Sequence, residues 1–215
     1  MKNMRKSELF AILIIIVSIL VGFFSYSQIP DRIASHWNAQ GEVDGYISRF
    51  WGLSVMPIVS IIMLLVLIFI PKTDPLKENV QKFRKYFDGF IMLIFLFLFY
   101  MHLLTILWNK GKEFNMIQFM IPALALLFYY SGILISHAEK NWFIGIRTPW
   151  TLSSENVWQK THKLGGKFFK VCGAVSLIGL FFPDIAIWIV ILPVIFTAAY
   201  LTYFSYKEYR KEFKK

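Results

Sequence analysis

Apolar residues fill six long runs along the chain, and short polar connectors separate the runs. The runs cover residues 9–24, 51–70, 87–108, 117–135, 168–182 and 185–206. Because a helix rises about 1.5 Å per residue, about 20 apolar residues cross a hydrocarbon core that is about 30 Å thick. The pattern therefore predicts an all-α fold, namely a polytopic membrane protein with six transmembrane helices.

Two of these runs allow more than one interpretation. The fifth reaches spanning length if residues 165–167 continue the helix upstream, with Lys167 and Lys170 extending toward the membrane interface. The first run follows a basic start and ends in Ser-Tyr-Ser at residues 25–27, which is also typical of a cleaved signal peptide. Cleavage would leave five spans.

Composition agrees with a membrane protein, and the charge distribution predicts its orientation. The chain is 57% hydrophobic and 17% charged, whereas soluble domains are about 25% charged. Of the 23 lysines and arginines, 19 lie in the N-terminal segment, the second and fourth connectors and the C-terminal tail. Because positive residues gather on the cytoplasmic side, we expect the N-terminus and the C-terminus to be cytoplasmic. The net charge of +10 then indicates contact with anionic membrane lipids, with no direct nucleic-acid binding.

The first connector, residues 28–50, contains two turn dipeptides, Gln40-Gly41 and Asp44-Gly45. The glycines can supply positive φ, and the Asp44 carboxylate can bond backbone amides in a turn. We therefore expect a small ordered cap on the outer face.

The second connector is basic and contains two prolines. Pro71 and Pro75 are expected to end the second helix, and residues 77–87 to extend the third helix into the cytoplasm.

The fourth connector is the longest polar stretch, with the sequence NWFIGIRTPWTLSSENVWQKTHKLGG over residues 141–166. Its Thr-Pro pair at 148–149 disfavours a helix, and Ser153 has the chemistry of an N-cap. The spacing predicts a short amphipathic helix over residues 154–164 at the inner interface, ended by the glycine pair at 165–166.

Three tryptophans in this connector allow two interpretations. Trp142, Trp150 and Trp158 are typical of the aromatic belt at the headgroup level. Alternatively, they form a binding surface with Arg147, whose guanidinium can hold a carboxylate or a phosphate beside aromatic faces.

Histidines are the first candidates for chemistry. The pairs His36/His102 and His137/His162 could bind a metal, but no spacing such as HExxH supports a site. His102 lies well inside an apolar run, as the thiol of Cys172 also does, so it is either a hydrogen-bonded neutral imidazole or a proton relay. With no P-loop and no GxSxG motif, we predict no catalytic residues, no metal and no cofactor.

Two motifs resemble known families. Residues 141–162 resemble the signature of the SdpI family of bacterial and archaeal membrane proteins, since they combine Gly-Ile-Arg-Thr-Pro with a Trp eight residues after the first Pro-Trp pair. The first connector is similar to a small domain of unknown function that is often found ahead of it. The resemblance implies an inner set of ligand-binding or partner-binding residues and an outer set. The inner set is Asn141, Gly145, Arg147, Thr148, Pro149, Trp150, Trp158 and His162, and the outer set is His36, Asn38, Gly41 and Asp44.

The resemblance also implies a function and partners. SdpI proteins protect the producing cell from a secreted toxin peptide, and the namesake also holds a small winged-helix repressor at the membrane. We therefore expect an N-terminal two-helix unit, residues 1–86, and a four-helix SdpI-like unit, residues 87–215, that together confer immunity. A transporter or channel for a small solute or peptide, and a membrane-embedded metal-dependent enzyme, stay open as alternatives.

Overall fold

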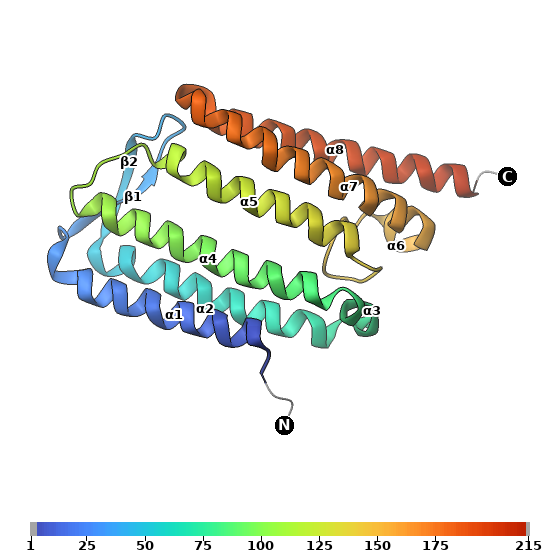
Figure 1. Ribbon diagram of the computed structural model, residues 1–215, viewed down its shortest axis with the longest axis horizontal. Coiled ribbons are helices and arrows are strands. Elements are labelled where there is room, and N and C mark those ends of the chain that lie inside the picture. The colour runs from blue at the N-terminus through green and yellow to red at the C-terminus, as the bar shows by residue number, and fades with distance from the viewer. Residues whose placement is uncertain (1–3, 214–215) are drawn as a thin grey trace.

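Six long helices run side by side in a computed structural model that describes residues 4–213 (Figure 1). The helices are α1 (Lys6–Ser25), α2 (Arg49–Thr73), α4 (Arg84–Asn109), α5 (Met116–His137), α7 (Glu155–Ser176) and α8 (Ala186–Phe213). All six are long and apolar enough to cross a membrane. The prediction of six spans is confirmed, and the chain is a multi-pass membrane protein.

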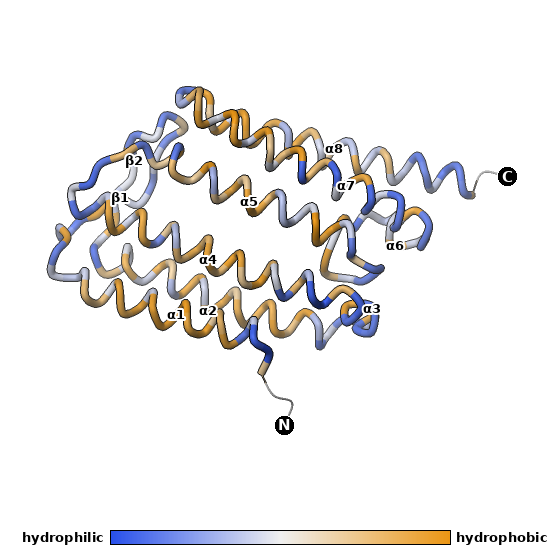
Figure 2. Tube along the Cα trace, viewed as in Figure 1, coloured by the Kyte–Doolittle hydropathy of each residue, from blue (hydrophilic) through white to orange (hydrophobic). Residues whose placement is uncertain are grey.

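The helices form two groups that meet along α4 and α5. Figure 1 shows α1, α2 and α4 on one side and α5, α7 and α8 on the other. Figure 2 shows that the long helices are mostly apolar between polar ends. Many of their apolar side chains, such as Ile62 and Phe196, are exposed. Such a surface is stable against lipid and unstable against water.

Glycines let α5 and α7 approach closely. A Cβ at Gly132 would lie 2.6 Å from the carbonyl oxygen of Gly166, and one at Gly173 would lie 2.6 Å from that of Ala125. Small residues allow this close backbone contact in membrane bundles. The prediction that the glycine pair at 165–166 ends a short interfacial helix is therefore wrong: α7 is one helix from Glu155 to Ser176, and its glycines serve packing.

The first connector contains strands, so the all-α prediction holds for the spans only. Strands β1 (Arg32–Trp37) and β2 (Val43–Ser48) pair in an antiparallel hairpin. Ile33 packs with Ile29, Leu53 and Ile106 at the ends of the helices. The expected ordered cap is thus a hairpin, which lies at one end of the bundle (Figure 1); this end is called the hairpin end below.

The opposite end, called the motif end, holds both ends of the described chain and differs from the expectations for the second connector. Helix α2 continues through Pro71 to Thr73, so Pro71 does not stop it. A separate short helix, α3 (Lys77–Lys82), precedes α4, and Phe83 breaks the backbone between the two. The link between α7 and α8 lies at the hairpin end (Figure 1) and consists of the 3₁₀ turns η2 (Leu177–Phe181) and η3 (Pro183–Ile185).

The orientation of the bundle can be checked by cysteine labelling, because the native Cys172 is buried. Lys110 is exposed at the hairpin end of α4 and Lys85 at its motif end. If the charge rule holds, a membrane-impermeant maleimide should label Lys110→Cys in intact cells and should leave Lys85→Cys unlabelled until the cells are permeabilised. The opposite labelling pattern would contradict cytoplasmic termini.

Candidate functional site

The sequence motif forms an irregular segment at the motif end, residues 138–154, which leads from α5 to α7 and packs against α7 and α8 (Figure 1). It contains one short helix, α6 (Pro149–Ser153). Outside regular structure, backbone amides and carbonyls that are shielded from water need side-chain partners. The buried residues of the motif supply these partners.

Asn141 holds the first turn of the segment. Its side chain is fully buried. The amide oxygen accepts hydrogen bonds from the backbone N–H groups of Phe143 and Ile144, at 2.9 and 2.6 Å. The amide nitrogen donates to the carbonyls of Glu139 and Ile144, at 2.8 Å each. One side chain thus satisfies four backbone groups, which aspartate or leucine could not do.

Trp158 and His162 form the centre of the segment. Trp158 is completely buried, donates its indole N–H to the carbonyl of Ala138 at 2.7 Å, and stacks on the imidazole of His162 at 3.8 Å between ring centroids. His162 Nδ1 lies 2.8 Å from the carbonyl of Trp158, and Nε2 accepts the backbone N–H of Ile146 at 3.0 Å. These partners require a neutral ring with its proton on Nδ1.

Gly145 lets the segment pass directly over His162. Its φ is +119°, which L side chains rarely adopt. A Cβ there would also lie 2.4 Å from His162 Nε2. Glycine is therefore required both by the backbone conformation and by the bond between Ile146 and His162.

Thr148 is extended, as the Thr-Pro pair predicts, but a helix that the sequence did not predict, α6, begins directly after it at Pro149. Thr148 Oγ1 accepts the N–H of Thr151 at 3.2 Å and shares a 2.9 Å hydrogen bond with the Ser205 hydroxyl of α8. Pro149 occupies the first turn, where its missing N–H has no cost. The Thr-Pro pair thus both begins α6 and fixes it to α8.

The N-cap of α7 is Ser154, and the prediction of Ser153 is wrong by one residue. Ser153 is the last residue of α6 and donates back to the carbonyl of Pro149. Ser154 Oγ accepts the N–H of Val157 at 3.2 Å and donates to the Glu212 carboxylate of α8 at 2.9 Å. Residues 149–153, where no helix was expected, form α6. The N-cap of α7 therefore moves from Ser153 to Ser154.

Arg147 is an exposed and charged member of the motif. Its guanidinium makes one hydrogen bond, from Nη1 to the carbonyl of Trp142 at 2.6 Å, and forms no ion pair with any described residue. The Trp142 side chain is 50% exposed. Trp150 is partly exposed, and its ring centroid lies 5.1 Å from that of Tyr206. Trp158, which is buried, cannot be a belt residue. The Arg147 guanidinium thus retains N–H donors for a partner, and the neighbouring Trp142 is exposed.

A cavity of about 490 Å³ opens beside the motif, between the two helix groups. His162 forms part of its wall, together with His137, Glu139 and Lys163. The ring of His137 stacks on Tyr86 of α4 at 3.7 Å. In this cavity His162 of the motif therefore shares a wall with polar and charged side chains from both helix groups.

The two histidine pairs that could have bound a metal are not arranged as metal sites. Both ring nitrogens of His162 are already bonded. His102 is buried in α4, with Nε2 3.2 Å from the carbonyl of Ser18, whereas His36 is exposed. Within residues 4–213, no three histidine, cysteine or carboxylate side chains gather as metal ligands.

Two residues of the second connector that the sequence reasoning missed bond to the motif. The buried carboxylate of Asp74 accepts the N–H of Trp142 at 2.9 Å and that of Leu76 at 2.7 Å. Asn79 Nδ2 donates to the carbonyl of Lys140 at 2.9 Å. The only signal in the sequence was an aspartate before a proline, which indicates a turn and nothing about its distant partner.

The outer set of residues lies at the hairpin end, so the structure does not bring the two sets together. His36 and Asp44 pair at 2.5 Å on the exposed surface. The side-chain oxygen of Asn38 accepts two backbone N–H groups of the turn, at 2.9 and 3.0 Å, and Gly41 has a φ of +83°. Asn115, before α5, donates to a turn carbonyl at 3.0 Å. These residues shape and attach the turn.

Asn109 is a second hairpin anchor that the sequence reasoning missed. Its buried side chain accepts the N–H of Ala34 at 2.8 Å and donates to the carbonyl of the same residue at 3.0 Å. It continues the hydrogen bonding of β1 as a further strand would. An asparagine after an apolar run carries no signal for this role.

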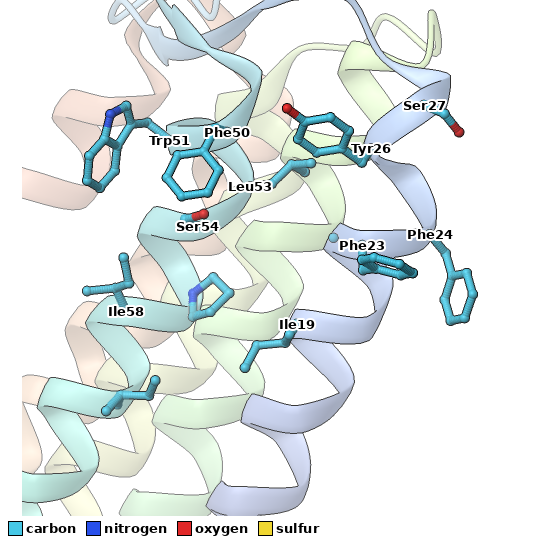
Figure 3. Close-up of a pocket in the computed structure, with 13 residues that line it drawn as sticks. Ile19, Phe23, Phe24, Tyr26, Ser27, Phe50, Trp51, Leu53, Ser54 and Ile58 are labelled. Carbon is cyan, nitrogen blue, oxygen red and sulfur yellow. The ribbon is translucent and has the colours of Figure 1, made fainter.

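A groove of about 910 Å³ lies between α1 and α2 at the hairpin end. Figure 3 shows aromatic side chains at its borders: Phe23 on α1, Tyr26 directly after α1, and Phe50 and Trp51 on α2. Phe23, Phe50 and Trp51 are each more than half exposed. The groove is open to the surroundings of the helices and is mostly apolar.

Comparison with known proteins confirms the resemblance seen in the motifs. The model of the SdpI/YfhL protein family matches residues 137–205, and that of a domain of unknown function, DUF1648, matches residues 13–61. The chain thus contains one segment that matches the SdpI/YfhL model and another that matches the DUF1648 model. The first contains the whole motif, α7 and much of α8, and the second contains most of α1, the hairpin and half of α2.

The similarity also extends along the full length of one SdpI protein. Immunity protein SdpI of Bacillus subtilis strain 168 is 27% identical over 207 residues, which is 96% of this chain and 97% of that protein. No solved structure matches the chain.

Two glycines with positive φ provide a test of the SdpI motif as a packed unit. Gly145→Ala should lower the free energy of unfolding by roughly 3 kcal/mol, because it combines an unfavourable φ with loss of the Ile146–His162 bond. Gly111→Ala has a similar backbone penalty, of about 1 kcal/mol, with no atom within 4 Å of the new Cβ. Thermal unfolding in detergent should separate the two variants, and equal losses would contradict the contact with His162.

Proposed function

We propose that this chain protects the membrane of its own cell against a secreted peptide toxin. The observation that carries the proposal is the similarity to an immunity protein along 96% of the chain. An SdpI-family segment with the complete motif adds to it. No step of this function needs a bond to be made or broken, so a catalytic residue has no place in it.

The hairpin end is the face that we assign to the toxin. The charge distribution predicts that this end lies outside the cell. A peptide that attacks a membrane from outside is amphipathic or apolar, and the groove between α1 and α2 offers it exposed aromatic surface at the depth where it would enter. The hairpin, held by Asn109 and Asn115, covers the neighbouring helix ends.

The motif end is the face that we assign to a cytoplasmic partner. Arg147 has unused guanidinium donors beside the exposed Trp142. Arginine and tryptophan are enriched among the residues that carry binding energy at interfaces. A small winged-helix repressor with a carboxylate on its surface would fit this chemistry, and holding it there would turn toxin binding into a transcriptional signal.

Immunity can be tested with the peptide fraction secreted by the strain that carries this gene. Sensitive cells that express the chain should survive this fraction better than cells with an empty vector. Arg147→Ala should leave survival intact, because the toxin is assigned to the other end, and should abolish recruitment of a repressor to membranes. Arg210→Ala is the matched control, since Arg210 is also exposed at the motif end and also makes one hydrogen bond.

Equal killing of expressing cells and empty-vector cells would contradict the immunity function. Loss of survival in Arg147→Ala, with Arg210→Ala unaffected, would instead place the protective contact at the motif end.

A further inference from the structure

A second cavity at the motif end lies among α1, α2, α3 and α4 and has a volume of about 690 Å³. This is within the range of about 300–1,000 Å³ that is typical of small-molecule sites. It is separate from the SdpI motif. Four cationic side chains line it, those of Arg5, Lys72, Lys77 and Arg84.

Arg84 is the buried cation of this cavity. Its side chain is 7% exposed. Its Nε donates to the Asp88 carboxylate at 2.8 Å, but its Nη2 is buried and has no hydrogen-bond partner within residues 4–213. The nearest oxygen of Glu8 is 3.9 Å from Nη2, which is too far for a hydrogen bond. A buried guanidinium nitrogen without a partner is costly, so the site is incomplete as it stands.

The neighbouring carboxylates already have other partners. Glu8 accepts the backbone N–H of Arg5 at 3.0 Å. Asp88 accepts the Ser7 hydroxyl at 2.8 Å and lies 3.5 Å from the Arg5 guanidinium. These two acids therefore offset the two arginines.

The lysines leave the cavity positive. Lys72 and Lys77 form no ion pair with any described residue, and the remaining acid of the lining is Glu78. With Asp88 beside the lining, four cations meet three carboxylates, which leaves one excess positive charge. An anion would meet a net attraction from several sides.

We propose that this cavity binds the phosphate group of an anionic ligand, with Arg84 Nη2 as the buried donor and Lys72 and Lys77 as the outer cations. Guanidinium donors match phosphate oxygens, and basic pockets between the cytoplasmic ends of transmembrane helices bind lipid headgroups. Ile68 and Pro71 of α2 add an apolar wall, which suits a phospholipid whose acyl chain continues along the helix. A free phosphate would use the same donors without that wall. The site is independent of the immunity function.

Native mass spectrometry of the detergent-purified full chain tests the site. Phosphatidylglycerol, phosphatidylcholine with the same acyl chains, and inorganic phosphate are titrated separately and in competition. The double variant Lys72→Gln/Lys77→Gln removes the outer cations, both exposed, so the fold should persist. Lys85→Gln/Lys167→Gln is the matched control, because it removes two exposed lysines that do not line the cavity.

Phosphatidylglycerol should bind more tightly than phosphatidylcholine, and the Lys72/Lys77 variant should weaken it about thirtyfold while the control leaves it unchanged. Failure of inorganic phosphate to displace phosphatidylglycerol would support a lipid as the source. Displacement by inorganic phosphate, lost in the same variant, would support the site with a soluble phosphate. Equal binding of the two lipids without phosphate binding, or equal losses in the two double variants, would overturn the site.

Discussion

The irregular segment between α5 and α7 has to hide its backbone polar groups at the end of a bundle that lipid surrounds. A buried amide or carbonyl without a hydrogen-bond partner costs about 1–3 kcal/mol. Several such groups would together cancel a large part of the free energy of unfolding of a typical protein. Asn141 bonds four of these groups, and His162 and Trp158 bond one more each, the N–H of Ile146 and the carbonyl of Ala138. Most residue types of the motif follow from this constraint.

The same constraint decides which motif residue is available for a partner. Six of the eight inner residues, all except Arg147 and Trp150, shape or connect the segment. Arg147 lies on the surface. Its guanidinium donates to one carbonyl and retains other donors for a partner. Asp74 and Asn79 bond the segment to the other helix group, so these hydrogen bonds hold the two groups together at the motif end.

Sequence alone predicts the parts of this structure that depend on local pattern. Six apolar runs gave six spans because an apolar stretch of about 20 residues forms a helix in lipid, where it must satisfy its own backbone hydrogen bonds. The hairpin was missed because its strands are short and its main anchor, Asn109, is 75 residues from its partner Ala34. The glycine pair at 165–166 misled because glycine both ends helices and lets them pack, and only the neighbour α5 distinguishes the two uses.

The motif itself was located from the sequence, but the division of labour within it was not. Whether Trp158 faces lipid or the core depends on α7 continuing past the glycines, and whether His162 is a ligand or a structural acceptor depends on Ile146, sixteen residues away. Both depend on tertiary contacts that no local pattern encodes.

In the proposed function the toxin binds at the hairpin end, and the motif end is left to a cytoplasmic partner. Site-specific photo-crosslinking distinguishes the two ends, with benzoylphenylalanine in place of Trp51 in the groove or of Trp142 beside Arg147, both about half exposed. In cells challenged with the secreted peptide fraction, we expect a crosslinked peptide at position 51 and none at position 142. A crosslink at position 142 alone would rule out the assignment of the toxin to the hairpin end.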